Sequence, residues 1–131
     1  MLPALHALPI DTSKLASWTA PRSLEFEWFA NARDLCNVLA ALGSRAGYDR
    51  NSELLRILSI NPGVAFDTTQ WPYIGYKGGA EPGVLNTSWL LQRSDGRWFS
   101  IVITLNDDAR LIDQNRVVAL ALGLSRLLNH E

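Results

Sequence analysis

The sequence contains only one cysteine, Cys36, among its 131 residues. A single thiol excludes a disulfide within the chain and leaves no cysteine-rich framework for a metal ion. Cys36 falls on the apolar positions of a helical pattern, so we expect a small buried core residue. The two histidines, His6 and His130, lie near opposite ends of the chain. They are therefore not expected to form a metal pair or a catalytic dyad with the cysteine, and we expect no cofactor.

An excess of charge and a long apolar run are also missing. Charged residues make up 19% of the chain and the net charge is -1, which argues against a basic nucleic-acid surface and an acidic tail. No stretch reaches the about 18 apolar residues of a membrane span. The first residues, MLPALHALPI, lack the positive start, apolar core and cleavage site of a signal peptide. We therefore expect no nucleic-acid or membrane partner, and the compartment is not encoded.

Apolar residues make up 47% of the chain, enough for one domain with its own core over residues 1–131. We expect residues 1–28 to form an extended lead-in segment, because three of the six prolines fall there and periodicity is weak. The apolar content of this segment is too high for a disordered tail. It should therefore lie against another surface.

Helical periodicity begins after the lead-in segment. In EWFANARDLCNVLAALGSRAG, apolar residues recur from Phe29 at intervals of three and four, with Asn31 as a candidate N-cap and Gly43 or Gly47 as the stop. NSELLRILSI predicts a second, shorter helix that opens with Asn51 or Ser52 as its cap. The first part of the domain is therefore expected to be helical.

The pattern changes to β after Pro72. YIGYK, VLNTSWLLQR and RWFSIVITL are rich in aromatic and β-branched residues and are bounded by turn formers. The last two runs are joined by Ser94-Asp95-Gly96, a strong hairpin signal, so they should pair antiparallel.

A final helix is predicted near the C-terminus, and the acidic pair Asp107-Asp108 ahead of it should stabilise its N-terminus. Its apolar residues are expected to lie along one stripe: Val117, Leu120, Ala121, Leu124, Leu127 and Leu128. The expected fold class is α+β, with N-terminal helices, a three-stranded antiparallel meander and a long C-terminal helix packed on the sheet. Such a sheet has two open edges, which are templates for another strand or another chain.

The order of these elements resembles the C-terminal part of the serine β-lactamase and penicillin-binding-protein superfamily, in particular its class A-like hydrolases. The likeness covers residues 29–131 and depends on four features in sequence: Arg33-Asp34 at a helix start, Lys77-Gly78-Gly79, the Asp95-Gly96 turn and the leucine-rich last helix. It implies a partial β-lactamase-like fold in a bacterial protein.

The resemblance also implies roles for the glycine-rich stretch GYKGGAEPGVLN. Lys77 would supply positive charge beside the reacting group, and the backbone N–H of Ala80 would serve as an oxyanion donor. Gly78, Gly79 and Glu81 would form the strand edge along which substrate lies, because glycine lets a ligand approach the backbone closely. A β-lactam or a peptidoglycan-like compound would be the ligand.

Two family features are missing. Gly78 stands where the family usually has a threonine or serine, so the hydroxyl that would hold a substrate carboxylate is absent. The nucleophile motif Ser-x-x-Lys also occurs nowhere, because Lys14 follows Asp11 by three residues and Lys77 follows Ile74. Without an activated serine the chain is expected to have no acyl-transfer activity of its own.

Three interpretations remain open from the sequence. The chain is the C-terminal part of a β-lactamase-like serine hydrolase, or it is a non-catalytic interaction module that uses an open sheet edge. In the third, a separately encoded N-terminal half supplies the nucleophile. The expected partner is accordingly a second copy, giving a homodimer, or the missing N-terminal half.

Overall fold

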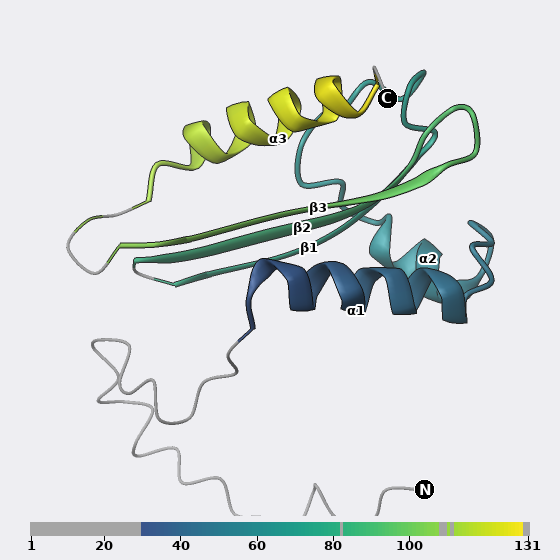
Figure 1. Cartoon of the computed structure of the whole chain (residues 1–131), viewed down its shortest axis with the longest axis horizontal. Helices are drawn as coiled ribbons and strands as arrows, with labels where there is room; N and C mark the ends of the chain where they lie inside the picture. Colours follow the sequence, from purple (N-terminus) through teal and green to yellow (C-terminus); the bar gives the residue numbers. More distant parts are fainter. Residues whose placement is uncertain (1–29, 82, 108–109, 111, 130–131) are drawn as a thin grey trace, which may run out of the picture.

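The structure is a computed structural model, and it describes residues 30–81, 83–107, 110 and 112–129. Two helices come first, then three strands, then a third helix. Figure 1 shows the sheet as the middle layer, with α3 on one face and α1 and α2 on the other. The expected α+β class with a three-stranded antiparallel sheet is confirmed. The predicted lead-in segment lies outside the described residues.

Helix α1 (Ala32–Arg45) begins and ends where local signals place it. The Asn31 side chain accepts a hydrogen bond from the Asp34 N–H, and the Asp34 carboxylate accepts one from the Asn31 N–H, which forms a capping box. Gly47, with φ +61°, follows the last turn and stops the helix. Gly43 is instead a buried residue inside it.

Helix α2 (Glu53–Leu58) is a short helix capped by Ser52. It packs against the first strand, where the Tyr73 hydroxyl donates a 2.9 Å hydrogen bond to the Leu55 carbonyl. Both residues are buried. Burial raises the pKa of Tyr73 to about 12, because the phenolate would lose its hydration there.

The sheet is a meander of β1 (Tyr73–Glu81), β2 (Val84–Gln92) and β3 (Trp98–Asn106) in the order β1-β2-β3. Both pairings are antiparallel. Gly83 (φ +78°) and Gly96 (φ +88°) occupy the two tight turns, where a positive φ favours glycine. β1 and β3 are the two edge strands of the described sheet, as predicted.

Helix α3 (Gln114–Leu128) lies across the sheet, mainly over β3. Its N-cap is Asp113, so the predicted role of Asp107-Asp108 at this helix start is wrong for Asp107, whose carboxylate accepts from the Arg110 N–H instead. The predicted single stripe is also corrected. The residues buried against the sheet are Val117, Ala121 and Ser125, whereas Leu120, Leu124 and Leu127 are exposed.

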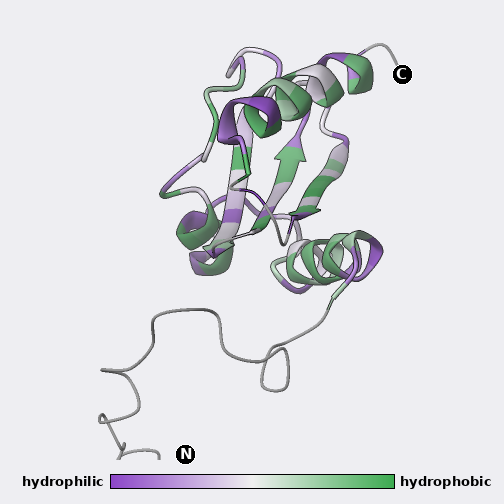
Figure 2. Ribbon diagram, turned by 90° about the vertical axis from the view of Figure 1, so that its left-hand side faces the viewer, coloured by the Kyte–Doolittle hydropathy of each residue, from purple (hydrophilic) through white to green (hydrophobic). Residues whose placement is uncertain are grey.

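The sheet separates two apolar cores, and Figure 2 shows hydrophobic segments of the strands between the helical layers. The larger core lies under α3 and is centred on the fully buried Trp89, with Trp71 beside it. The smaller core lies under α1 and α2 and contains Leu39, Leu55, Tyr73 and Leu90. Cys36 is only half-buried, which corrects its predicted full burial.

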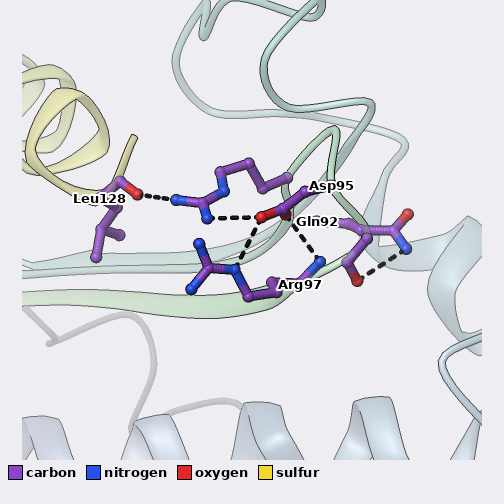
Figure 3. Close-up of polar contacts among 6 residues, drawn as sticks. Gln92, Asp95, Arg97 and Leu128 are labelled. Carbon is purple, nitrogen blue, oxygen red and sulfur yellow. Dashed lines mark hydrogen bonds and ion pairs between the residues drawn. The ribbon is translucent and has the colours of Figure 1, made fainter. Parts of the chain in front are cut away.

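The C-terminal end of α3 is tied to the β2-β3 hairpin by the buried Arg93 (Figure 3). One guanidinium nitrogen donates to the Leu128 carbonyl and another donates to Asp95 Oδ2 at 2.6 Å. The same carboxylate oxygen accepts from Arg97 Nε at 2.8 Å. One cation thus holds the last turn of α3 and the hairpin turn together.

Candidate functional site

Among the described residues, β1 is paired on one side only, by β2, and the alternation of the ladder shows which of its backbone groups point away from the sheet. Hydrogen bonds run from Arg93 N to Arg97 O at one end of the β2-β3 pair and from Asp107 N to Gly83 O at the other. Hydrogen-bonded pairs alternate along antiparallel strands, so the odd-numbered residues of β2 bond to β3 and the even-numbered ones bond to β1. In the β1-β2 register their partners are the odd-numbered residues of β1, whose backbone N–H and C=O groups therefore point toward β2. The residues whose backbone N–H and C=O groups point away from the sheet are Ile74, Tyr76, Gly78 and Ala80.

Lys77 lies in the middle of this edge strand, and its side chain is exposed. The odd-numbered β1 side chains lie on the face covered by α1 and α2, since Tyr73 belongs to that core. The amine nevertheless reaches the edge, where Nζ donates a 2.7 Å hydrogen bond to the outward-pointing Gly78 carbonyl. The amine therefore lies beside the free backbone groups of the strand.

Two glycines of this stretch are required by packing. The ring of Tyr76 lies over Gly78, where a Cβ would meet the Tyr76 hydroxyl at 2.1 Å and the ring at 2.7 Å. The same ring lies against Gly63, where a Cβ would come within 2.7 Å of it. Tyr73 covers Gly75 in the same way, with 2.6 Å to its hydroxyl. Each tyrosine thus leans along the strand over the glycine two residues ahead.

Gly79 has no such reason to be glycine. A Cβ added there would meet no atom within 4 Å, and the residue is exposed. Its open side is the Lys77 face of the strand, because both positions are odd-numbered. Gly79 is therefore the residue of this stretch that leaves room for something outside the described fold.

A cavity of about 310 Å³ opens on the opposite, α3 face of the same strand. Its polar groups are few: the Thr87 hydroxyl is bonded to the Ile103 carbonyl at 3.4 Å, and Gln114 is exposed at the start of α3. Aromatic and aliphatic side chains form most of the wall. The lining residues that matter here are Tyr76, Gly78, Ala80, Trp89, Val117 and Val118.

All five predicted site residues lie in the last five positions of β1: Lys77, Gly78, Gly79, Ala80 and Glu81. They share one edge but not one face. Lys77, Glu81 and the open side of Gly79 lie on one face of the strand. Gly78 and Ala80 face the cavity on the other side, and Gly79 also contributes to its lining. Sequence reasoning missed Tyr76 and Trp89, although the repeated Tyr-x-Gly spacing in YIGYKGG signals rings that cover glycines.

The β1 edge presents backbone groups beside the Lys77 amine. The hydrogen bond of the Lys77 amine goes to a backbone carbonyl, and within the described ranges no hydrogen bond or ion pair joins the amine to a serine, histidine or carboxylate. The described residues also contain no group of three His, Cys, Asp or Glu side chains that could hold a metal ion. What the edge presents is a row of backbone donors and acceptors beside one cation.

We predict that Gly78 and Gly79 respond differently to alanine. Gly78→Ala should lower the free energy of unfolding by about 2 kcal/mol, because Tyr76 is held between Gly63 and Trp89 and cannot move aside cheaply. Gly79→Ala should change it by less than about 1 kcal/mol, and a gain is expected because alanine reduces unfolded-state entropy. Urea denaturation of the two variants measures the difference. Equal losses would contradict the assignment of Gly78 to packing and Gly79 to open space.

No protein-family model matches the chain, and no curated protein matches it. The resemblance to serine β-lactamases therefore stays a prediction from the quoted motifs. In addition, none of the described helices is long and apolar enough to cross a membrane.

Proposed function

We propose that the chain is a non-catalytic binding module that holds an extended partner segment along the free edge of β1. Binding by strand addition needs unpaired backbone groups on an accessible edge strand, and main-chain hydrogen bonds then supply affinity. The alternation of the ladder directs the N–H and C=O groups of Gly78 and Ala80 outward. The open space at Gly79 lets a bound chain lie close to the strand.

The observation that carries this proposal is the position of the Lys77 amine, 2.7 Å from the outward Gly78 carbonyl. In the unbound chain this contact satisfies an edge acceptor and protects the strand from unspecific pairing. A ligand that carries a carboxylate would draw the amine away and release the carbonyl for a backbone bond. The favoured partner is thus an extended segment with an anionic group near Lys77.

The absence of Ser-x-x-Lys from the whole sequence supports a non-catalytic role. An acyl-transfer enzyme needs a nucleophile with a base in hydrogen-bond reach. The amine that could act as that base is exposed and bonded to a carbonyl. Strand addition therefore uses only groups that the chain has, whereas acyl transfer needs a paired nucleophile and base that the sequence does not contain.

A second candidate is the one that the resemblance implies: the sheet part of a β-lactamase-like serine hydrolase, inactive until another part supplies the nucleophile. One observation favours it. Lys77 and Ala80 are three residues apart on the edge strand, and the Ala80 N–H points outward, where the described strands provide no ladder partner. An oxyanion donor needs such a free N–H.

Both candidates can be tested by titrating the ¹⁵N-labelled chain with two probes, a peptide ending in D-alanyl-D-alanine and benzylpenicillin. We expect the amides of Gly78 and Ala80 to shift most, because they lie on the free edge. Lys77→Ala should weaken binding of the peptide about ten-fold, since a charge-assisted hydrogen bond is lost. Arg45→Ala, which removes an exposed cation from α1, is the matched control and should change nothing.

The outcomes separate the candidates. A preference for the peptide, with no change in intact mass after incubation with benzylpenicillin, supports the binding module. A preference for benzylpenicillin with its largest shift at Ala80 supports the hydrolase part. Shifts confined to residues away from β1, or a penicilloyl adduct on a serine, would contradict the proposed function.

A further inference from the structure

The other edge strand, β3, has the same length as β1 but lacks the glycines and charged residues of β1. It is nine residues long, WFSIVITLN, and contains no glycine, proline or charged residue. Proteins usually place such residues on a free edge strand to prevent pairing with another chain. A long edge strand without them is therefore a pairing site. The same alternation directs the odd-numbered residues of β3 toward β2. The outward backbone groups belong to Trp98, Ser100, Val102, Thr104 and Asn106.

An apolar flank of α3 lies on the same side of the molecule. Val118 faces the cavity beside β1, on one side of the buried line through Val117 and Ala121. With 3.6 residues per turn, the exposed leucines fall on the other side of that line, toward β3. They are Leu120 (51% exposed), Leu124 (39%) and Leu127 (67%). A hollow of about 650 Å³ lies along these leucines and extends over Ala119 and Gly123 on the outer side of the helix.

We propose that a second copy of the chain occupies this flank, with β3 pairing antiparallel to β3 of the second copy about a two-fold axis at Val102. In that register Val102 exchanges both backbone hydrogen bonds with its own counterpart, and Ser100 faces Thr104 of the second copy. The two sheets join into one. The symmetric arrangement uses one patch on both copies, as an isologous interface requires.

The charge at the flank fits a second copy. An axis perpendicular to the sheet places the two α3 helices on the same face, side by side and antiparallel. Arg116, which lines the hollow near the start of α3, then lies beside the C-terminal turn of the other helix, where carbonyl groups favour a cation. The exposed leucines fill the space between the helices.

The area also fits a stable dimer. A nine-residue strand is about 30 Å long, and a sheet with a helix layer on each face is about 25 Å thick. The side of the molecule formed by the β3 edge and the helices above and below it therefore offers about 750 Å² per copy. This is close to the about 800 Å² per partner of a stable interface. The β1 edge stays free, so self-association and ligand binding use opposite sides of the sheet.

Mass measurement by light scattering at about 100 µM tests the proposal. The natural chain is expected at twice the 14.5 kDa of one copy. The double variant Leu120→Lys/Leu124→Lys should halve that mass, whereas the matched control Val118→Lys, on the opposite flank of the same helix, should not. Thr104→Pro should also halve it, because proline removes an outward N–H and spares the β2-β3 ladder. Circular dichroism checks that each variant is folded.

Amide exchange gives a second readout, which compares the natural chain with the folded double variant. In the natural chain the amides of Ser100, Val102 and Thr104 should exchange about ten-fold more slowly than in the Leu120→Lys/Leu124→Lys variant. Those of Ile101 and Ile103 should be protected in both, since they pair with β2. A monomeric natural chain, or a dimer that persists in folded Thr104→Pro, would overturn the proposal. Neither result bears on ligand binding at β1, which the titration measures separately.

Discussion

Replacing Trp89 by alanine is expected to lower the free energy of unfolding by about 4 kcal/mol. The side chain lies in the middle of the central strand and has no exposed surface. Its ring contacts Tyr76, with 5.3 Å between centroids, and Phe66 edge-on at 5.7 Å. Removing it opens a large cavity in the core under α3, because the sheet and the helix cannot collapse into the space.

The indole also fixes a loop. Its Nε1 donates a 2.9 Å hydrogen bond to the Pro62 carbonyl, and the adjacent Gly63 (φ +69°) lies against the Tyr76 ring. Loss of Trp89 therefore frees Tyr76 on two sides, and the packing over Gly78 at the β1 edge should loosen. The stability of the whole core and the order of the candidate site depend on the same residue.

Urea denaturation measures the loss, and Trp89→Phe is the matched control. Phenylalanine keeps part of the apolar volume but loses the indole hydrogen bond to the Pro62 carbonyl, which keeps its 2.7 Å bond from the Val64 N–H, so we expect a loss of about 2 kcal/mol. The titration of the β1 edge should weaken in Trp89→Ala more than in Trp89→Phe. A loss below about 2 kcal/mol for alanine would show that the core relaxes around the gap and that Trp89 is not its centre.

The elements that the sequence predicted well are those with local signals. Asn31 and Gly47 bound α1 because a side-chain cap and a positive φ are decided by a few neighbouring residues. The Asp95-Gly96 turn fixes the register of β2 and β3 for the same reason. Alternation of apolar residues then identified the strands. These features need no knowledge of the tertiary contacts.

The buried face of α3 could not be predicted in this way. Leucines surround much of the helix, so periodicity alone favoured a stripe through Leu120 and Leu124. The sheet instead takes the small residues Ala121 and Ser125, because they allow the helix to approach β3 closely. Which stripe is buried depends on the shape of the opposing surface, and the leucines left outside define the flank that we assign to a second copy.

The sequence predicted which stretch of the chain carries the candidate site, but it did not predict which face of the strand each residue takes. The predicted strand YIGYK ended at Lys77, and the structure extends it through Gly78 and Gly79 to Glu81, so all of these residues share one edge strand. Sequence reasoning treated Gly78 and Gly79 as equivalent, whereas one is covered by Tyr76 and the other faces open space. The distinction depends on which face each residue takes and on the direction of a neighbouring ring.

Arg93→Met is expected to lower the free energy of unfolding by about 3 kcal/mol. Methionine keeps much of the side-chain length but cannot donate to the Leu128 carbonyl or to Asp95, and both bonds come from a guanidinium that is largely buried. The guanidinium also lies 5.1 Å from the centre of the Phe99 ring, a favourable cation-π contact. The last turn of α3 should then fray away from the hairpin.

The acid limb of the stability curve gives this prediction a second readout. The hydrogen bond from Arg93 holds the pKa of Asp95 below its usual range. Because the folded state lowers this pKa, the carboxylate contributes stability above the unfolded pKa of about 3.9. That contribution disappears as the pH falls through the lower folded pKa.

We therefore expect the natural chain to lose stability below about pH 4 more steeply than Arg93→Met does. Asp95→Asn should remove the same part of the acid limb, and it should cost less at pH 7 because Asp95 is exposed and Arg93 keeps its bond to Leu128. Urea denaturation at pH 3 and pH 7 measures both effects. If Arg93→Met and Asp95→Asn destabilise equally at pH 7, the bond to the end of α3 contributes nothing, and the hairpin pair alone accounts for the role of Arg93.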